Sequence, residues 1–209
     1  MILGACIPAS NYRNILDVGT GTGVLALMAK QQNPQAKITA IDIDEQSEID
    51  CRVNFQASQW NTDLSYINKS IFDYSPDSLF DCIISNPPYY EDGLLSSKSE
   101  INAVKHTKDF DLKLFFNVCS NLLTSSGEMW TILPSENMLK WIDHTTSIGL
   151  FPKTIISVYG KPEQLKRVIL NLSKTKNVTK TFDLTIRSNS NDYTDQYKEL
   201  TKEFHSKTL

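Results

Sequence analysis

The sequence predicts an α/β fold with a seven-stranded, mostly parallel sheet that ends in an antiparallel hairpin and carries helices on both faces. Three observations lead to this fold class. Short apolar segments alternate with helix-like segments, which is typical of parallel sheets. A glycine-rich turn follows the first apolar segment. The last two long strands are separated only by Gly160–Leu165, which is too short for a parallel crossover and therefore predicts a hairpin.

The expected elements follow one another along the chain in a regular order. Strands are predicted at Asn14–Asp17, Lys37–Ile43, Ser65–Asn68, Asp81–Ser85, Gly127–Leu133, Lys153–Tyr159 and Lys166–Ser173. Helices are predicted at Gly23–Gln32, Glu45–Ser58, Phe110–Leu123 and Ser135–Ser147, the last with Ser135 as its N-cap. Residues 180–209 form a C-terminal extension, with strand character at Lys180–Arg187 and an amphipathic helix at Asp192–Phe204 that places Tyr193, Tyr197, Leu200 and Phe204 on one face.

Composition places the chain among ordinary globular proteins. Its 209 residues suit one domain, 1–209, because this length can bury a sizeable core. The longest apolar runs, such as 82–84 and 168–170, are too short to span a bilayer, and the N-terminus has no basic region before a long apolar run. We therefore expect no membrane partner, no signal peptide and a cytoplasmic location.

Cysteine and histidine spacing argues against a metal site. The cysteines and histidines lie far apart and include no C-x-x-C pair, so they lack metal-ligand spacing. Buried, reduced thiols are the expected state of the cysteines. These residues are Cys6, Cys51, Cys82, Cys119, His106, His144 and His205.

A tight glycine turn connects the first predicted strand to the first helix. In ILDVGTGTGVLAL, residues 15–27, Gly19, Gly21 and Gly23 permit the turn and the close approach of a ligand to the backbone. The helix that starts there offers unpaired N–H groups to an anionic or polar group. Asp42, at the end of the next strand, can accept both hydroxyls of a ribose. We therefore expect a nucleotide-like cofactor here rather than an unliganded turn.

NAD, FAD and S-adenosylmethionine all suit such a turn, and two residues favour the last. The dinucleotide pattern G-x-G-x-x-G requires glycine at position 24, which is Val24. Asp17 would suit a ligand with an ammonium group, which S-adenosylmethionine has and NAD lacks. Parallel strands that close on an antiparallel pair are also the arrangement of Rossmann-like class I methyltransferases, whereas ordinary dinucleotide-binding folds lack that pair.

The segment Asn86-Pro87-Pro88-Tyr89 ends the fourth predicted strand, beside the strand that carries the glycine turn. An exocyclic amine on a flat ring is a poor nucleophile because its lone pair is delocalised into the ring. The Asn86 side-chain oxygen and the Pro87 carbonyl can accept its hydrogens and stabilise positive charge as the nitrogen attacks a methyl group. Tyr89 offers a face on which a flipped base can stack. The alternative interpretation is a rigid turn without chemistry.

The order of glycine turn, acid and NPPY resembles the amino-methyltransferases that modify adenine N6, guanine N2 or glutamine amides. Within that group, the chain is similar to the bacterial tRNA(Val) (adenine-37-N6)-methyltransferases. The similarity covers nearly the whole chain, through ILGACIP, LDVGTGTGVLALMAKQ, FDCIISNPPYY, GEMWTILPSE, LKRVIL and the terminal DYTDQYKELTKEFH. The glycine turn and NPPY indicate only the superfamily, whereas the flanking segments and the tail indicate the family.

This resemblance implies transfer of methyl from S-adenosyl-L-methionine to adenine N6 in tRNA. The implied catalytic residues are Asn86, Pro87 and Tyr89; the implied cofactor contacts are Asp17, Gly19, Thr20, Gly21, Gly23, Asp42, Ile43, Ser70 and Ile71; Pro88 and Tyr90 are expected to contact the substrate. Family members tend to have an acidic residue near the cofactor's adenine, where this chain has Ser70, with Asp73 three residues later. They also begin with a further segment, including a K-x-G-T-D run, which we expect this chain to lack.

The last third of the chain contains a basic stretch. Residues 153–180 hold seven cations against one acid, in a chain whose net charge is −3. Because the 160–165 hairpin follows a strand parallel to the central ones, its tip is expected on the active-site face. Lys161, Lys166 and Arg167 can then contact tRNA phosphates. A solvated basic face is the alternative.

The segment after NPPY is long for this fold. Residues 91–108 suit a lid, and Lys98, Lys105 and His106 there suit RNA contact. Two functional alternatives stay open at this point. The same motif supports guanine-N2 or glutamine-amide methylation, and the expected lack of the N-terminal segment also allows a catalytically silent RNA-binding protein.

Overall fold

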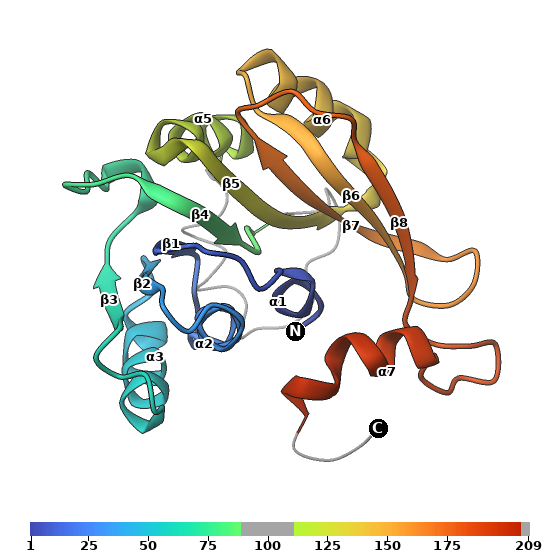
Figure 1. Cartoon of the computed structure of the whole chain (residues 1–209), viewed down its shortest axis with the longest axis horizontal. Helices are drawn as coiled ribbons and strands as arrows, with labels where there is room; N and C mark the ends of the chain where they lie inside the picture. The colour runs from blue at the N-terminus through green and yellow to red at the C-terminus, as the bar shows by residue number, and fades with distance from the viewer. Residues whose placement is uncertain (89–110, 206–209) are drawn as a thin grey trace.

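Eight strands form one sheet in the order β3-β2-β1-β4-β5-β7-β6-β8. The computed structural model describes residues 1–88 and 111–205 (Figure 1). The strands are β1 (Asn14–Val18), β2 (Lys37–Asp42), β3 (Leu64–Asn68), β4 (Phe80–Ser85), β5 (Leu123–Pro134), β6 (Phe151–Tyr159), β7 (Leu165–Ser173) and β8 (Lys180–Thr185). The helices are α1 (Ile2–Cys6), α2 (Val24–Gln32), α3 (Glu45–Ala57), α5 (Leu112–Leu122), α6 (Met138–Ser147) and α7 (Asp195–Thr201), with short 3-10 turns η1 (Ile71–Asp73), η2 (Ser135–Asn137) and η3 (Lys202–Phe204).

Strand directions confirm the predicted fold class. β1 pairs in parallel with β2 and β4, β2 with β3, and β4 with β5. β7 is antiparallel to both β5 and β6, so β6 runs in the same direction as the central strands. The predicted hairpin between β6 and β7 is therefore confirmed, and its tip lies at the carboxyl edge of the sheet.

The sheet has one strand more than the seven predicted. β8, in the C-terminal extension, pairs in parallel with β6 and adds a strand at the edge of the sheet. Only Leu184 of β8 is buried. Its sequence, KTFDLT, accordingly lacks the continuous apolar run that is typical of the inner strands. An edge strand buries less of its surface, which explains why its sequence is a weaker signal than that of β4, where five of six residues are buried.

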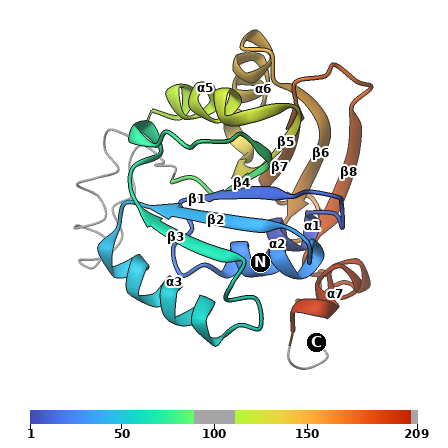
Figure 2. The same cartoon turned by 60° about the vertical axis from the view of Figure 1, so that its left-hand side comes forward.

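Helices cover both faces of the sheet, as predicted. Figures 1 and 2 show α5 and α6 on one face, and α1, α2, α3 and α7 on the other. On the face covered by α5 and α6, Phe115 and Phe116 of α5 pack against sheet residues such as Ile83. On the opposite face, Ala26 of α2 and Phe55 of α3 belong to a second apolar cluster, which includes sheet residues such as Ile38. The sheet is therefore buried from both sides, which leaves its carboxyl edge as the place for a ligand.

Three local predictions differ from the structure. Ser135 is not a helix N-cap, because residues 135–137 form a 3-10 turn and its hydroxyl donates to the Leu165 carbonyl at 3.5 Å. α6 starts only at Met138. The C-terminal helix starts at Asp195, so Tyr193 lies before it and contacts Tyr197 by ring stacking at 5.0 Å. α1 was not predicted, since five residues are too few to show a helical period.

The described residues contain no membrane-spanning helix and no metal-binding cluster, and their cysteines are free. No helix in residues 1–88 or 111–205 is long and apolar enough to cross a membrane. Across the described parts of the chain, no group of three or more His, Cys, Asp or Glu side chains is placed to hold a metal ion. All four cysteines are free, and Cys51, Cys82 and Cys119 are buried, as expected.

Candidate active site

The glycine turn separates into an open part and a packed part. Gly19 and Gly21 have φ of 70° and 53°, the left-handed region that favours glycine, and a Cβ built on either meets none of the described residues within 4 Å. A Cβ on Gly23 (φ 81°) would instead lie 2.7 Å from the Phe55 ring and 2.8 Å from Cys51 Sγ. Gly19 and Gly21 thus leave room for a ligand, whereas Gly23 allows α2 to pack closely on α3.

Asp42 lies at the carboxyl end of β2, next to this turn. Its Oδ2 accepts the Gly21 amide at 2.8 Å, and its Oδ1 accepts the Asp44 amide at 3.0 Å. Each carboxylate oxygen can accept further hydrogen bonds, and the side chain is only partly buried. The structure therefore places Asp42 beside the glycine turn, where its carboxylate is accessible and can accept hydrogen bonds from ribose hydroxyls.

The expected adenine contacts lie after β2 and β3. Ile43 is 49% exposed, whereas the Ile71 side chain is buried in the core, so Ile71 can offer a ligand only its backbone. The Ser70 hydroxyl accepts the Phe72 amide at 3.2 Å and caps η1. Phe72, which the sequence interpretation missed, is 37% exposed. Two consecutive apolar residues do not by themselves mark a binding site in a sequence, because such pairs also occur at many surface positions without function.

Asp17 lies beneath the turn and is fully buried. Its Oδ2 accepts the Thr20 hydroxyl at 2.6 Å, while Oδ1 has no hydrogen-bond partner among the described residues. Burial raises the pKa of Asp17 to about 7, which the Thr20 hydroxyl and the nearby Ala26 amide partly offset. An unpaired buried carboxylate oxygen below an open glycine turn is what a ligand with an ammonium group would complement, so the residues present suit S-adenosylmethionine.

The raised pKa of Asp17 makes a testable prediction about stability. The unfolded carboxyl ionises near its ordinary pKa of 3.8, whereas the folded one ionises near 7. This carboxyl should therefore make wild-type stability fall with rising pH between those values, by about 1.4 kcal/mol per pH unit, and its contribution should level off above 7. Asp17→Asn should remove that slope. Urea unfolding at pH 5 and pH 8 measures it, and equal slopes in both proteins would contradict the raised pKa.

The NPPY segment starts directly beside the glycine turn. β4 pairs with β1 up to the pair Val18 and Ser85, so Asn86 and Gly19 are the next residues on two adjacent strands. Asn86 is exposed, Pro87 is buried and Pro88 is exposed. Tyr89 and Tyr90, together with the predicted lid at 91–108, lie outside the described residues. The structure thus brings the two central motifs of the sequence to one edge of the sheet.

Ser85 is a residue that the sequence interpretation missed. It is fully buried, and its hydroxyl donates to the Val18 carbonyl at 2.8 Å. The sequence does not indicate a role for this serine, because its hydrogen bond forms only when β1 and β4, which lie far apart in the sequence, pair with each other.

The basic stretch divides between the two edges of the sheet. β7 runs opposite to β6 and β8, so Lys161, Lys166 and Arg167 lie at the carboxyl edge. The other four cations lie at the amino edge; they are Lys153, Lys174, Lys176 and Lys180. Lys153 also forms an ion pair with Glu128 at 2.5 Å. The seven cations therefore do not form one continuous patch, and only Lys161, Lys166 and Arg167 share an edge with NPPY, as expected from the predicted hairpin.

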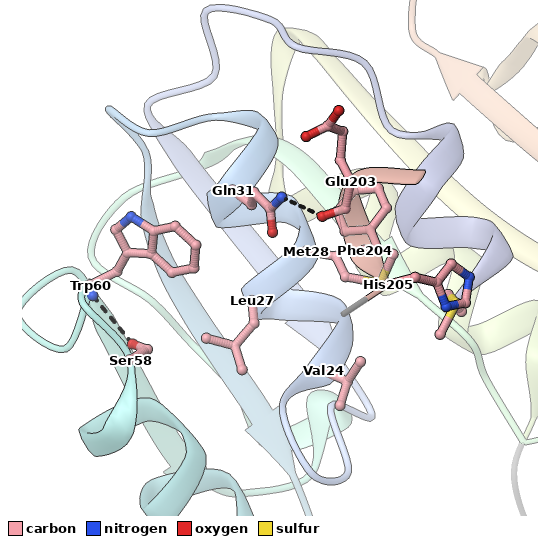
Figure 3. A pocket seen from close by; sticks show the side chains of 10 residues that line it. Val24, Leu27, Met28, Gln31, Ser58, Trp60, Glu203, Phe204 and His205 are labelled. Carbon is pink, nitrogen blue, oxygen red and sulfur yellow. Dashed lines mark hydrogen bonds between the residues drawn. The ribbon is translucent and has the colours of Figure 1, made fainter. Parts of the chain in front are cut away.

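A separate hollow lies on the outer face of α2. Figure 3 shows Leu27 and Met28 of α2 between Trp60 on one side and Phe204 of η3 on the other. Gln31 closes one end by donating to the Glu203 carbonyl at 2.9 Å. None of the predicted site residues lines this hollow.

The sheet order, the open glycine turn and its neighbour NPPY define a class I, S-adenosylmethionine-dependent methyltransferase. Residues 1–142 match the methyltransferase small domain family. A predicted O-methyltransferase from Agrobacterium tumefaciens has the same fold, with a TM-score of 0.70 and 15% identity over 96% of this chain and 94% of that one. A putative RNA methyltransferase from Pyrococcus horikoshii has a TM-score of 0.59 and 15% identity over 80% and 77%.

Sequence relatives define the particular family. The tRNA1(Val) (adenine(37)-N6)-methyltransferase of Vibrio campbellii is 34% identical over 99% of this chain and 87% of its own length. The protein of that name from Phocaeicola vulgatus is 33% identical over 98% and 88%. The chain belongs to the tRNA1(Val) (adenine(37)-N6)-methyltransferase family, as its sequence resemblance predicts.

Proposed function

We propose that this chain transfers the methyl group of S-adenosyl-L-methionine to the exocyclic N6 of an adenine in tRNA, and that the adenine is position 37 of a valine tRNA. Similarity to enzymes of that name over nearly the whole chain is the observation that carries this function. A substrate of this kind also favours a cytoplasmic location.

The cofactor is held, in this proposal, by the three loops that follow β1, β2 and β3. Gly19 and Gly21 give the methionine part access to the backbone, and Asp17 supplies negative charge beneath it. Asp42 accepts the ribose hydroxyls, and Ile43 covers the adenine ring with its exposed side chain. Thr20 acts indirectly, because its hydroxyl is committed to Asp17.

The chemistry requires little of the protein beyond orientation and charge stabilisation. S-adenosylmethionine supplies a methyl group made electrophilic by the sulfonium sulfur. Asn86 and Pro87 accept the hydrogens of the adenine amine, which offsets the positive charge that develops on nitrogen during in-line attack. The methylated amine loses its proton readily, so a strong general base is not needed. Consistent with this, neither motif contains a histidine.

Four cations at the carboxyl edge are proposed to contact tRNA phosphates. They are Lys161, Lys166, Arg167 and Arg187. The Arg187 amide donates to the Gly160 carbonyl at 3.1 Å, which places Arg187 beside the hairpin. Its guanidinium lies over the Tyr193 ring at 4.0 Å, so its orientation is restricted. The sequence interpretation missed Arg187, because only the pairing of β8 with β6 brings it to this edge.

The division of the basic stretch predicts a difference in salt dependence. Lys161→Ala with Lys166→Ala should reduce the slope of log affinity for tRNA against log salt by about 0.7–0.9 for each phosphate that the variant no longer neutralises. Lys176→Ala with Lys180→Ala removes the same charge at the amino edge and should leave the slope nearly unchanged. Titrations of tRNA at several salt concentrations measure both. Equal slopes for the two double variants would contradict contact at the carboxyl edge.

Substrate identity can be tested with labelled cofactor. The chain is incubated with unmodified tRNA, with ribosomal RNA and with a release-factor protein, and the product nucleosides are separated. N6-methyladenosine from tRNA alone is the expected result. Label recovered as N2-methylguanosine would show that the substrate is guanine rather than adenine. Label recovered in the release-factor protein would show that the substrate is a glutamine amide. Absence of any label, together with no heat of cofactor binding, would indicate a silent RNA-binding protein.

A further inference from the structure

Ser85 links the two halves of the proposed site. On β1, the residue after Val18 is Gly19, where the open turn begins. On β4, the residue after Ser85 is Asn86, which carries the proposed acceptor. The Ser85 hydroxyl donates to the Val18 carbonyl at 2.8 Å, so a side-chain hydrogen bond reinforces the main-chain pairing of the two strands at the point where both functional segments begin.

The chemistry of prolines explains why this bond matters. Pro87 and Pro88 have no N–H, so the β1–β4 ladder cannot continue through them. On its other side, the glycine turn is tied to β2, because the amides of Gly19 and Thr20 donate to the Ile41 carbonyl at 2.9 and 3.2 Å. The Ser85 hydroxyl provides the corresponding tie to β4. Its complete burial strengthens the bond, since water cannot compete for either partner.

We propose that Ser85 is a positioning residue for methyl transfer, which fixes Asn86 and Pro87 relative to the cofactor turn. This inference rests on the proposed function. Ser85 is fully buried and therefore acts through its neighbours rather than on the substrate. A displacement of about 1 Å in a reacting geometry can cost on the order of 10²-fold in rate, and loss of one tie is expected to permit part of that displacement.

Ser85→Ala tests the proposal because it removes only the hydroxyl oxygen. We expect the single-turnover rate at saturating cofactor and tRNA to fall by about tenfold or more, with both dissociation constants within about twofold of wild type. Ser85→Thr keeps a hydroxyl and should recover part of the rate. A rate unchanged in Ser85→Ala would overturn the positioning role.

Thr201 offers a matched control far from the site. It is also fully buried, and its hydroxyl donates to the Tyr197 carbonyl at 2.8 Å within α7. Thr201→Val should lower thermal stability by an amount similar to that of Ser85→Ala without slowing methyl transfer. An equal loss of rate in both variants would show that Ser85 serves stability alone.

A measurement without RNA separates this inference from the proposed function. The side-chain amide signal of Asn86 can be assigned in a ¹⁵N spectrum by its loss in Asn86→Ala. In Ser85→Ala that signal should shift or broaden, whereas Thr201→Val should leave it unchanged. If wild type fails to methylate tRNA but the signal responds as expected, the proposed substrate is wrong and the positioning role stands. An unchanged signal in Ser85→Ala overturns the positioning role whatever the substrate.

Discussion

Replacing Asn86 with alanine is expected to lower the rate of methyl transfer by about 10²- to 10³-fold, the usual loss when one electrostatic partner of a developing charge is removed. Asn86 stands at the carboxyl end of β4, next to the open turn after β1, and its side chain is exposed rather than packed in the core. Its loss should therefore remove stabilisation of the transition state while the fold and the affinity for tRNA stay nearly intact. Single-turnover transfer of labelled methyl to tRNA measures this rate.

The control for Asn86 is another exposed asparagine. Asn177 lies in the β7–β8 connection at the opposite edge of the sheet. Asn177→Ala should retain the wild-type rate. A wild-type rate in Asn86→Ala would remove that residue from the mechanism, and a large loss of tRNA affinity there would assign it to binding instead.

Gly19→Ala is expected to weaken cofactor binding by about tenfold or more, which is at least ~1.4 kcal/mol. The new methyl group would enter the space where the proposed cofactor approaches the backbone, because a Cβ on Gly19 meets no atom of the described residues within 4 Å. The same change should also lower the free energy of unfolding, since φ at this position is 70°. A residue with a Cβ is less stable than glycine in this left-handed conformation by about 1–2 kcal/mol. Calorimetry with S-adenosylmethionine gives the affinity, and urea unfolding gives the stability.

Gly149 separates these two effects. It has φ of 79°, and a Cβ there would likewise meet nothing within 4 Å in the described part of the chain, but it lies after α6 and outside the site. Gly149→Ala should cost similar stability without any change in cofactor affinity. Equal cofactor affinities in the two variants would contradict a cofactor above Gly19.

Strongly patterned elements of this fold could be predicted from sequence. β4 is an apolar run that ends abruptly at two prolines, and its burial matches that of an inner parallel strand. The glycine turn was predictable because the strand before it and the helix after it are both distinct, and the structure places three glycines there in the left-handed region. Asp42 could be placed next to that turn, because the carboxyl ends of adjacent parallel strands share one edge.

Features that depend on tertiary pairing could not be predicted. The hairpin that reverses β7 was predicted, but only the pairing of β8 with β6 places Lys180 at one edge of the sheet and Arg187 at the other. Lys30 is fully buried, and only the fold supplies its partners, the carbonyls of Pro34 and Ala36 and the Asp63 carboxylate. The Ser85 bond likewise exists only because β1 and β4 are adjacent.

The proposed reaction requires a methyl donor above the β1 turn that faces an amine held at the end of β4. A crystal structure of the chain with bound S-adenosylmethionine would reveal this arrangement. We predict the methionine part over Gly19 and Gly21, the ribose on Asp42, and the sulfonium methyl directed at Asn86. Cofactor bound in the hollow between Trp60 and Phe204, or a methyl group directed away from Asn86, would contradict the proposed mechanism.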